Sequence, residues 1–246
     1  MKQWQSKYHL IELDNIDSTN SEAKRIAASG TAEASVIWAH KQTAGRGRYG
    51  RVWESGSGNL YMSILIPLAC PLAQAAELSF ITGLATYEVV NSLVKGNDTQ
   101  IPISLKWPND IFIGDNKIGG ILLESITHEN QTWIIIGLGL NLEHSPEGIG
   151  NASSLIDHGM NLSSQNALDL IMESFERYHN MWKIYGFSNI RKLWLEKAYR
   201  IGQKVTVGDI NNQVTGIFES LDEYGAIQLK LESRKIYTLS TGEMFF

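Results

Sequence analysis

The chain has 246 residues, with 21 Lys or Arg against 26 Asp or Glu, which gives a formal net charge of −5 and a pI near 5.7. This acidic balance argues against a general nucleic-acid binder. Hydrophobic residues make up 43% and charged residues 19% of the chain. These fractions are typical of a globular protein and exclude the disordered, collagen-like and disulfide-scaffold classes.

The chain shows no signal for export, membranes or metal. Its single cysteine, Cys70, rules out an internal disulfide, and the opening MKQWQS has no apolar stretch of signal-peptide length. No run approaches the ~18 apolar residues of a membrane span. The six histidines have no ligand spacing. We therefore expect a reducing, cytoplasmic setting, no membrane partner and no metal-ligating residues.

The first hundred residues alternate between strand and helix patterns. A run of four N-cap residues at 17–20 predicts a helix start, and Gly30 predicts its end. The apolar, weakly periodic stretch 73–94 predicts a buried helix. Alternation between apolar and polar residues predicts strands at 8–16, 35–42 and 59–67.

The second half continues this mixture of helix and strand patterns up to about residue 200, where the helix patterns end. Strands are expected at 104–107, 110–113, 117–125 and 132–142. One helix face is expected to be core, formed by Leu168, Ile171, Met172, Phe175, Tyr178, Trp182 and Tyr185. From residue 201 only short strands and turns remain. The order predicts an α+β domain over 1–200 and a small β-barrel domain over 201–246.

The charge is uneven, since residues 41–51 hold four cations and no acid. Within this stretch, residues 45–50 read G-x-G-x-x-G. A dinucleotide site would open a helix here and meet an acid about 20 residues on, yet a strand pattern follows and no acid lies between Glu54 and Glu77. A protein kinase would also need H-R-D and D-F-G, which are absent. Glycine alternating with arginine instead brings backbone N–H groups and guanidinium groups close to a bound anion, so the stretch is a candidate anion-binding loop. The alternative is a solvated basic loop without a ligand.

Five blocks in order carry a family resemblance. They are DSTN at 17–20, QTAGRGRYGR at 42–51, KWPND at 106–110, KIGGILLE at 117–124 and GLGLN at 137–141. Together they resemble the biotin–protein ligases, over the chain from about residue 10 to its end. The resemblance implies a mixed-sheet catalytic domain of the class II synthetase type over 1–200, followed by an SH3-like β-barrel over 201–246.

The resemblance also implies an ATP-dependent reaction in two steps. Biotin and ATP would form biotinyl-5′-AMP, and biotin would then pass to a carrier lysine. At ~4 Å the carboxylate and polyphosphate repel by about 4 kcal/mol at an effective dielectric of 20, so fixed cations are needed where they meet. Arg48, Lys106 and Lys117 are the implied catalytic residues, and Arg46 is expected beside them.

Further residues would bind the ligands. The implied set is Ser18, Thr19, Asn20, Gln42, Gly45, Arg46, Gly47, Arg48, Trp53, Asn109, Lys117, Gly120, Gly137 and Asn141. Residues 18–20 with Gln42 would hold the ureido head of biotin, and residues 45–48 would fold over it. Asn109 and Asn141 would bond the adenylate. Residues 18–20 also read as a plain helix N-cap, and Thr19-x-x-Glu22 as a capping box.

The implied substrates are biotin and ATP, with Mg²⁺ held through phosphates, so we name no metal residue. The implied partner is a biotin carboxyl carrier protein of acetyl-CoA or related carboxylases. The sequence leaves open whether the protein forms a homodimer. Many bacterial members carry an N-terminal helix-turn-helix domain and act as repressors. Here the pattern starts within the first 20 residues, so we expect a ligase without that domain and without a nucleic-acid partner.

Two features depart from the family pattern. Residues 143–160 hold no Trp, Tyr or Phe, where some relatives place an aromatic over adenine. The chain also stops at Phe246, without the arginine that some relatives carry beyond this point, and Arg234 or Lys235 would have to compensate. The nearest alternative is a lipoate–protein ligase or octanoyltransferase of the same fold, which lacks the doubled Gly-Arg and the 106–110 block. A catalytically silent ligand-binding protein is the other alternative.

Overall fold

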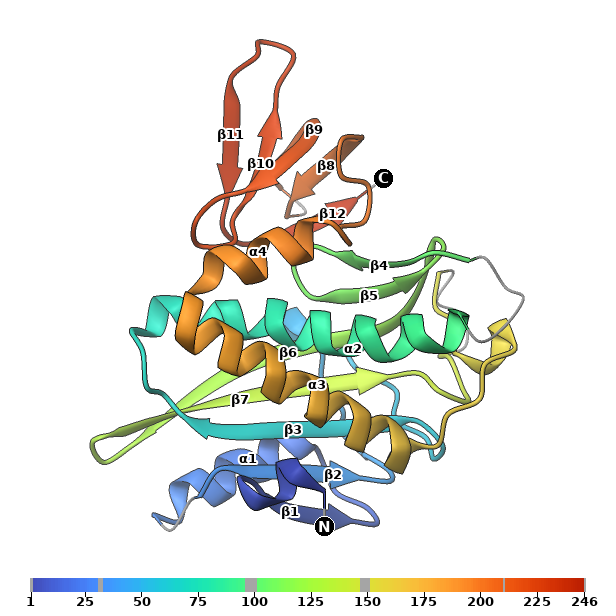
Figure 1. Ribbon diagram of the computed structural model, residues 1–246, viewed down its shortest axis with the longest axis vertical. Coiled ribbons are helices and arrows are strands. Elements are labelled where there is room, and N and C mark those ends of the chain that lie inside the picture. Colours follow the sequence, from blue (N-terminus) through green and yellow to red (C-terminus); the bar gives the residue numbers. More distant parts are fainter. Residues whose placement is uncertain (1, 31–32, 96–100, 147–150, 210, 246) are drawn as a thin grey trace.

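The computed structural model describes residues 2–30, 33–95, 101–146, 151–209 and 211–245, and it contains two sheets (Figure 1). The larger sheet holds β1 (His9–Leu13), β2 (Ser35–Ala39), β3 (Leu60–Pro67), β4 (Ile103–Lys106), β5 (Asp110–Ile113), β6 (Asn116–His128) and β7 (Gln131–Leu140). Their order is β1-β2-β3-β7-β6-β5-β4. Only β1 and β2 are parallel. The predicted α+β class with a mixed sheet is confirmed.

Helices cover both faces of this sheet, because its strands are apolar on both sides. The helices are α1 (Thr19–Ala28), α2 (Glu77–Lys95), α3 (Ser164–Tyr185) and α4 (Phe187–Leu195). Ile37, Leu65 and Ile135 pack against α1, whereas the adjacent Ile64 and Ile136 belong to the core beneath α2 and α3. Figure 1 shows α2 and α3 crossing one face of the sheet. No helix in the described part of the chain is long and apolar enough to cross a membrane.

Some helix predictions differ from the structure. The expected helix over 73–94 is divided into a 3-10 turn, Leu72–Ala76, and α2. Sequence periodicity missed α4, which starts beyond Gly186, a residue with φ of 74° that ends α3. The placement of Tyr185 in the core is wrong, since it is 64% exposed at the end of α3. Short 3-10 turns also occur at Gln3–Ser6, Arg48–Gly50 and Ile156–His158.

The C-terminal strands form a separate antiparallel sheet above β4 and β5 (Figure 1). It holds β8 (Lys204–Gly208), β9 (Gln213–Leu221), β10 (Ile227–Lys230), β11 (Ile236–Leu239) and β12 (Glu243–Phe245), in the order β11-β10-β9-β8-β12. The indole N–H of Trp107 donates to the carbonyl of Gly225 at 3.0 Å, which joins the two parts. The predicted all-β unit is confirmed, while the domain boundary at residue 200 stays a prediction.

The N-terminal segment is fixed to α3 through two carboxylates of that helix. Trp4 is buried and donates to Asp169 at 3.0 Å, and both Lys7 and Tyr8 hydrogen-bond Glu176. Burial alone would raise the pKa of Glu176, but hydrogen bonds from His179, Lys7 and Tyr8 outweigh it and lower that pKa to about 2. The ionised form of Glu176 therefore stabilises the folded state.

We predict that Glu176 contributes to acid sensitivity. Its folded pKa lies below the ordinary 4.5, so its contribution is present above pH 4.5 and is lost as pH falls toward 2. Glu176→Gln should lower the free energy of unfolding by on the order of 3 kcal/mol at pH 7, and by much less near pH 2. Urea unfolding across this pH range measures the difference. Glu173→Gln, at an exposed position of the same helix, is the control, and equal effects of both variants would contradict the prediction.

Candidate active site

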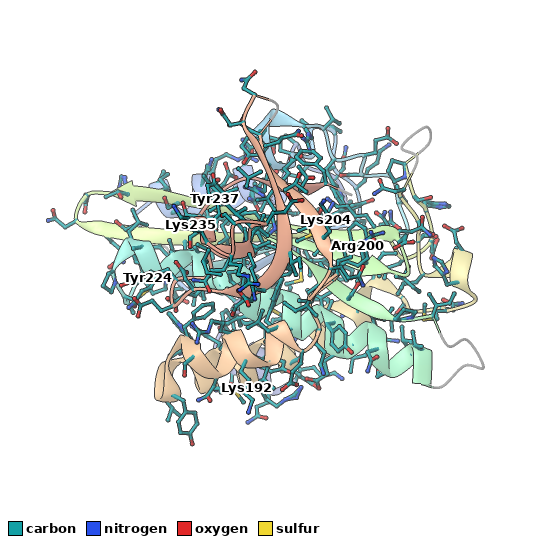
Figure 2. The ribbon with its side chains drawn as sticks, turned by 90° about the horizontal axis from the view of Figure 1, so that it is seen from above. Lys192, Arg200, Lys204, Tyr224, Lys235 and Tyr237 are labelled. Carbon is teal, nitrogen blue, oxygen red and sulfur yellow. The ribbon has the colours of Figure 1, made fainter. Side chains whose placement is uncertain are left out.

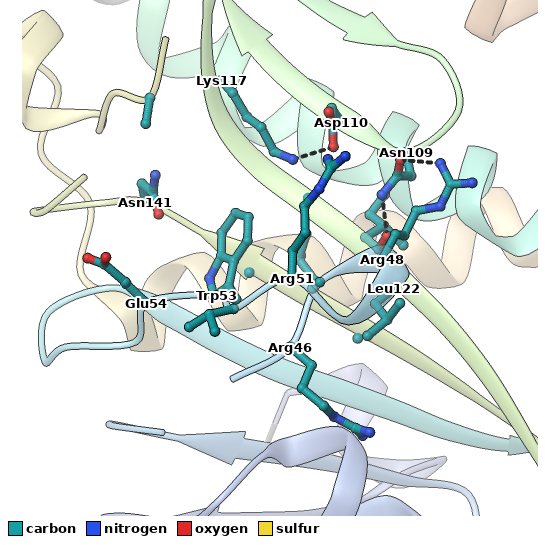
Figure 3. A pocket seen from close by; sticks show the side chains of 18 of the residues that line it. Arg46, Arg48, Arg51, Trp53, Glu54, Asn109, Asp110, Lys117, Leu122 and Asn141 are labelled. Atoms are coloured by element: carbon teal, nitrogen blue, oxygen red, sulfur yellow. Dashed lines mark hydrogen bonds and ion pairs between the residues drawn. The ribbon is translucent and has the colours of Figure 1, made fainter. Parts of the chain in front are cut away.

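A cavity of about 290 Å³ lies on the α1 side of the large sheet, between β6, β7 and the loop over residues 42–54 (Figure 3). It brings together residues from all five sequence blocks. The predicted site residues that line it are Ser18, Thr19, Asn20, Gln42, Arg46, Gly47, Arg48, Trp53, Lys106, Asn109, Lys117, Gly120, Gly137 and Asn141. Gly45 is not among the lining residues.

Glycines in β6 and β7 make room for the cavity wall. A Cβ on Gly139 would lie 2.5 Å from the indole nitrogen of Trp53, and one on Gly120 would lie 3.3 Å from the same ring. A Cβ on Gly137 would collide with the side chain of Asn20. The absence of side chains therefore allows this close approach. The indole N–H of Trp53 is buried against this backbone and has no hydrogen-bond partner among the described residues.

A buried polar network forms one end of the cavity. The side-chain carbonyl of Gln42 accepts a hydrogen bond from the backbone N–H of Thr19 at 2.8 Å, and the side-chain NH₂ of Gln42 donates to the hydroxyl of Ser55 at 2.9 Å. The Ser63 hydroxyl lies 2.7 Å from the Thr19 hydroxyl and 2.6 Å from the Asn20 carbonyl oxygen. Because these groups hold one another, donors and acceptors are positioned before any ligand arrives.

The capping-box interpretation of these residues is wrong. Ser18 is the N-cap of α1, and its side chain makes no capping hydrogen bond. The carboxylate of Glu22 binds Arg25 at 2.6 Å instead of reaching back to the helix start. The Asn20 amide donates to Glu124 on β6 at 2.9 Å. Helix capping therefore does not explain why polar residues occupy positions 18–20.

The glycine-arginine loop is ordered by its own backbone. The N–H of Gly47 donates to the carbonyl of Arg51 at 2.7 Å, and the N–H of Trp53 donates to that of Gly45 at 2.9 Å. A Cβ on Gly45 would collide with the carbonyl of Trp53 and the hydroxyl of Ser55. Gly45, expected to contact ligand, instead allows the loop to close on itself.

The cations of the site are held by acids and carbonyls. Arg48 donates to the side-chain carbonyl of Asn109 at 3.2 Å and to the backbone carbonyl of Gly242 at 3.1 Å (Figure 3). Lys117 pairs with Asp110 at 2.6 Å. Burial lowers the pKa of the Lys106 ammonium, an effect that nearby Asp110 opposes and Lys117 reinforces. Three cations from separate sequence blocks are thus fixed at one end of the cavity.

Arg46 does not join this group, contrary to the sequence expectation. Its guanidinium binds Glu124 at 3.1 Å and Ser21 at 3.2 Å, and Figure 3 shows it directed away from the other cations. Arg51 lies with them instead and pairs with Glu243 at 2.7 Å. Sequence reasoning missed Arg51 as a site residue, although it is the last cation of the basic stretch. The deciding partner, Glu243, lies nearly 200 residues away.

Asn109 and Asn141 use their amides to hold backbone. The Asn109 amide donates to the carbonyl of Ile121 at 2.7 Å, and that of Asn141 donates to Ser153 at 3.0 Å. The N–H of Lys117 also donates to the carbonyl of Asn151 at 2.6 Å. The segment that follows residue 150 is thereby fixed beside Lys117. The aromatic-free stretch 143–160 is described only in part, because residues 147–150 lie outside the described chain.

The C-terminal sheet reaches the cavity through β12. Glu243 and Met244 line it. Arg234 and Lys235 follow β10 in the turn that leads to β11, and neither lines the cavity. The expectation that one of them replaces a missing arginine is therefore not supported by their position.

Comparisons with known proteins agree with this geometry. The model of the biotin/lipoate A/B protein ligase family matches residues 12–141, and that of the biotin protein ligase C-terminal domain matches residues 201–246. The chain is 32% identical to a biotin–[acetyl-CoA-carboxylase] ligase of Paracoccus denitrificans, over 95% of this chain and 99% of that one. The chain belongs to the biotin/lipoate A/B protein ligase family.

Other members of the family extend the comparison. The bifunctional ligase/repressor BirA of Bacillus subtilis is 30% identical over 94% of this chain and 72% of its own length. Among solved structures, the biotin protein ligase of Aquifex aeolicus in complex with biotin and ATP superposes with a TM-score of 0.79 and 26% identity. That match covers 96% of this chain and 97% of the Aquifex chain. The two-sheet architecture is therefore shared with a ligase.

We predict that Gly139→Ala destabilises the protein by about 1–3 kcal/mol, because the added methyl group must displace the indole of Trp53. Thermal and urea unfolding measure the loss. Gly56→Ala is the matched control, since nothing lies within 4 Å of a Cβ at Gly56. If both variants were equally stable, the close approach at Gly139 would not be a constraint on the fold.

Proposed function

We propose that this protein activates biotin with ATP as biotinyl-5′-AMP and transfers biotin to a lysine of a biotin carboxyl carrier protein. The observation that supports this most is a single cavity with two chemically different ends. One end is a buried polar network around Gln42, and the other holds Arg48, Lys106 and Lys117. Family membership and the relatives named as biotin ligases support the same substrate.

The polar end suits the ureido group of biotin, which both donates and accepts hydrogen bonds. Thr19, Asn20 and Gln42 present amide and hydroxyl groups there, already fixed by Ser55 and Ser63. The body of the ligand would lie along the wall formed by the indole ring of Trp53 and the glycine backbone of β6 and β7. A ligand bound this way directs its carboxylate toward the cationic end.

In the first step, a carboxylate oxygen of biotin attacks the α-phosphorus of ATP. A new P–O bond forms as the bond to pyrophosphate breaks, and the leaving group takes the electron pair. Arg48, Lys106 and Lys117 would offset the repulsion between the two anions and the charge that develops in the transition state. Arg51, held by Glu243, would add a fourth positive charge. ATP would arrive with Mg²⁺ bound through its phosphates.

In the second step, the amine of a carrier lysine attacks the acyl carbonyl of biotinyl-5′-AMP. The new C–N bond forms as the acyl–phosphate bond breaks, AMP leaves with the electron pair of that bond, and the amine nitrogen loses a proton to solvent. Lys117 is suited to polarise the carbonyl, since Asp110 holds its ammonium 2.6 Å away. We propose that the acceptor is a carrier domain of acetyl-CoA carboxylase or a related carboxylase, in the cytoplasm. Lipoate is the less supported alternative, because the named relatives are biotin ligases.

We predict that Lys117→Ala lowers the rate of adenylate formation by about 100-fold or more, because a fixed positive charge is removed where charge develops. Biotin-dependent exchange of labelled pyrophosphate into ATP measures this step without the carrier. Lys41→Ala is the control, an exposed lysine in the same basic stretch. Adenylate formation at the full rate in Lys117→Ala would refute the role of Lys117.

We predict that Arg48→Gly releases biotinyl-5′-AMP into solution. Arg48 ties the loop to Asn109 and Gly242, so its loss opens the cavity over the acyl-adenylate. The variant should biotinylate lysines of an unrelated bystander protein, as detected by streptavidin blotting. Arg234→Gly is the control. Arg234 lies in an exposed turn, and glycine readily adopts its backbone φ of 63°. Unchanged target specificity in Arg48→Gly would contradict retention by this arginine.

A further inference from the structure

A second cavity, of about 900 Å³, lies on the opposite face of the large sheet. Ile66 and Ile134 line it, and both belong to the core beneath α2 and α3. Successive residues of a strand face opposite sides of the sheet. Ile134 on β7 faces this second cavity, whereas Gly137 and Gly139 on the same strand face the other side, where they line the first cavity. The two cavities are therefore separated by the sheet. The size of the second one suits a small organic ligand.

Apolar and aromatic side chains form most of its wall. Trp182 from α3, Phe187 from α4 and Tyr224 from the turn after β9 line it together with Leu78. Tyr224 is 62% exposed and lies where the small sheet approaches the start of α2 (Figure 2). The cavity thus opens toward solvent beside an aromatic residue. Aromatic faces attract cations as well as apolar groups.

One buried carboxylate in this cavity has no cationic partner. Glu77 begins α2 and is 4% exposed, and the only hydrogen bond to its carboxylate among the described residues comes from the indole N–H of Trp182 at 2.5 Å. No ion pair within the described chain involves it, whereas Glu176 in the same cavity has Lys7. The helix N-terminus offsets part of the burial cost. A buried carboxylate without a cation remains unfavourable.

The other charges around the cavity leave this carboxylate uncompensated. Glu223 is exposed at the mouth and adds negative charge, while Lys183 is exposed at the rim and forms no ion pair within the described chain. His179 is buried and stacks on Trp182 with ring centroids 5.7 Å apart. The arrangement therefore favours a ligand that brings its own positive charge.

We propose that this cavity binds a small arylalkyl ammonium compound. The ammonium would donate to the carboxylate of Glu77 and lie near the aromatic face of Trp182. The aryl group would occupy the apolar wall around Ile66, Leu78 and Phe187. This site is separate from the site of biotin chemistry and takes a cation, whereas the first cavity takes anions.

The probe for the test is 4-fluorophenethylamine, followed by fluorine NMR titration of the full chain. Wild-type protein should bind it at least ten times more tightly than the neutral 4-fluorophenethyl alcohol. Glu77→Gln keeps the size of the side chain and an acceptor for Trp182 but removes the charge. It should weaken amine binding at least tenfold and abolish the preference over the alcohol. Glu223→Gln, at the exposed mouth, is the matched control and should change binding by less than threefold.

A second variant keeps the test decisive if Glu77→Gln does not fold. Cys70 lines the same cavity and is half-buried, so Cys70→Trp should fill part of the cavity and weaken amine binding at least tenfold. Equal binding of the amine and the alcohol to wild type would overturn the proposal, as would no detectable amine binding at millimolar concentration. Displacement of the amine by biotin would also overturn it, because the probe would then occupy the first cavity.

Discussion

The candidate active site depends on the close approach of one indole ring to the backbone of two strands. Trp53 rests against β6 and β7 at Gly120 and Gly139, where any side chain would meet the ring. This contact anchors the loop that carries Arg48 and Arg51, and it provides the wall against which a ligand would lie. The glycines of the sequence blocks are therefore spatial requirements of packing before they are features of catalysis.

The second organising feature is the pairing of each cation with a fixed partner. Bringing the positive charges of Arg48, Lys106 and Lys117 together is unfavourable unless acids and carbonyls lie beside them. Asp110 and Asn109 supply such groups from the large sheet, and the small sheet supplies others near Gly242. The C-terminal sheet is thus part of the site. Its contribution explains how residues at the far end of the chain help to orient a loop near residue 48.

Much of this organisation was predictable from local sequence. The strands, α1 and α3 follow from periodicity and from helix termini, and the five blocks identify the residues that gather in the cavity. Long-range pairing was not predictable. Arg46 and Arg51 look alike in sequence, and only the positions of Glu124 and Glu243 decide which of them joins the cationic end. Gly45 and Asn141 likewise face backbone partners that no local pattern reveals.

The central claim is that the polar end of the cavity selects biotin and that the cationic end activates it for transfer to a carrier lysine. The most direct measurement is mass spectrometry of a purified biotin carboxyl carrier domain incubated with this protein and ATP, supplied with either biotin or lipoic acid. We predict one biotin attached to one lysine, dependent on ATP, and no modification with lipoic acid. Modification by lipoic acid in preference to biotin, or no modification by either acid, would contradict the account.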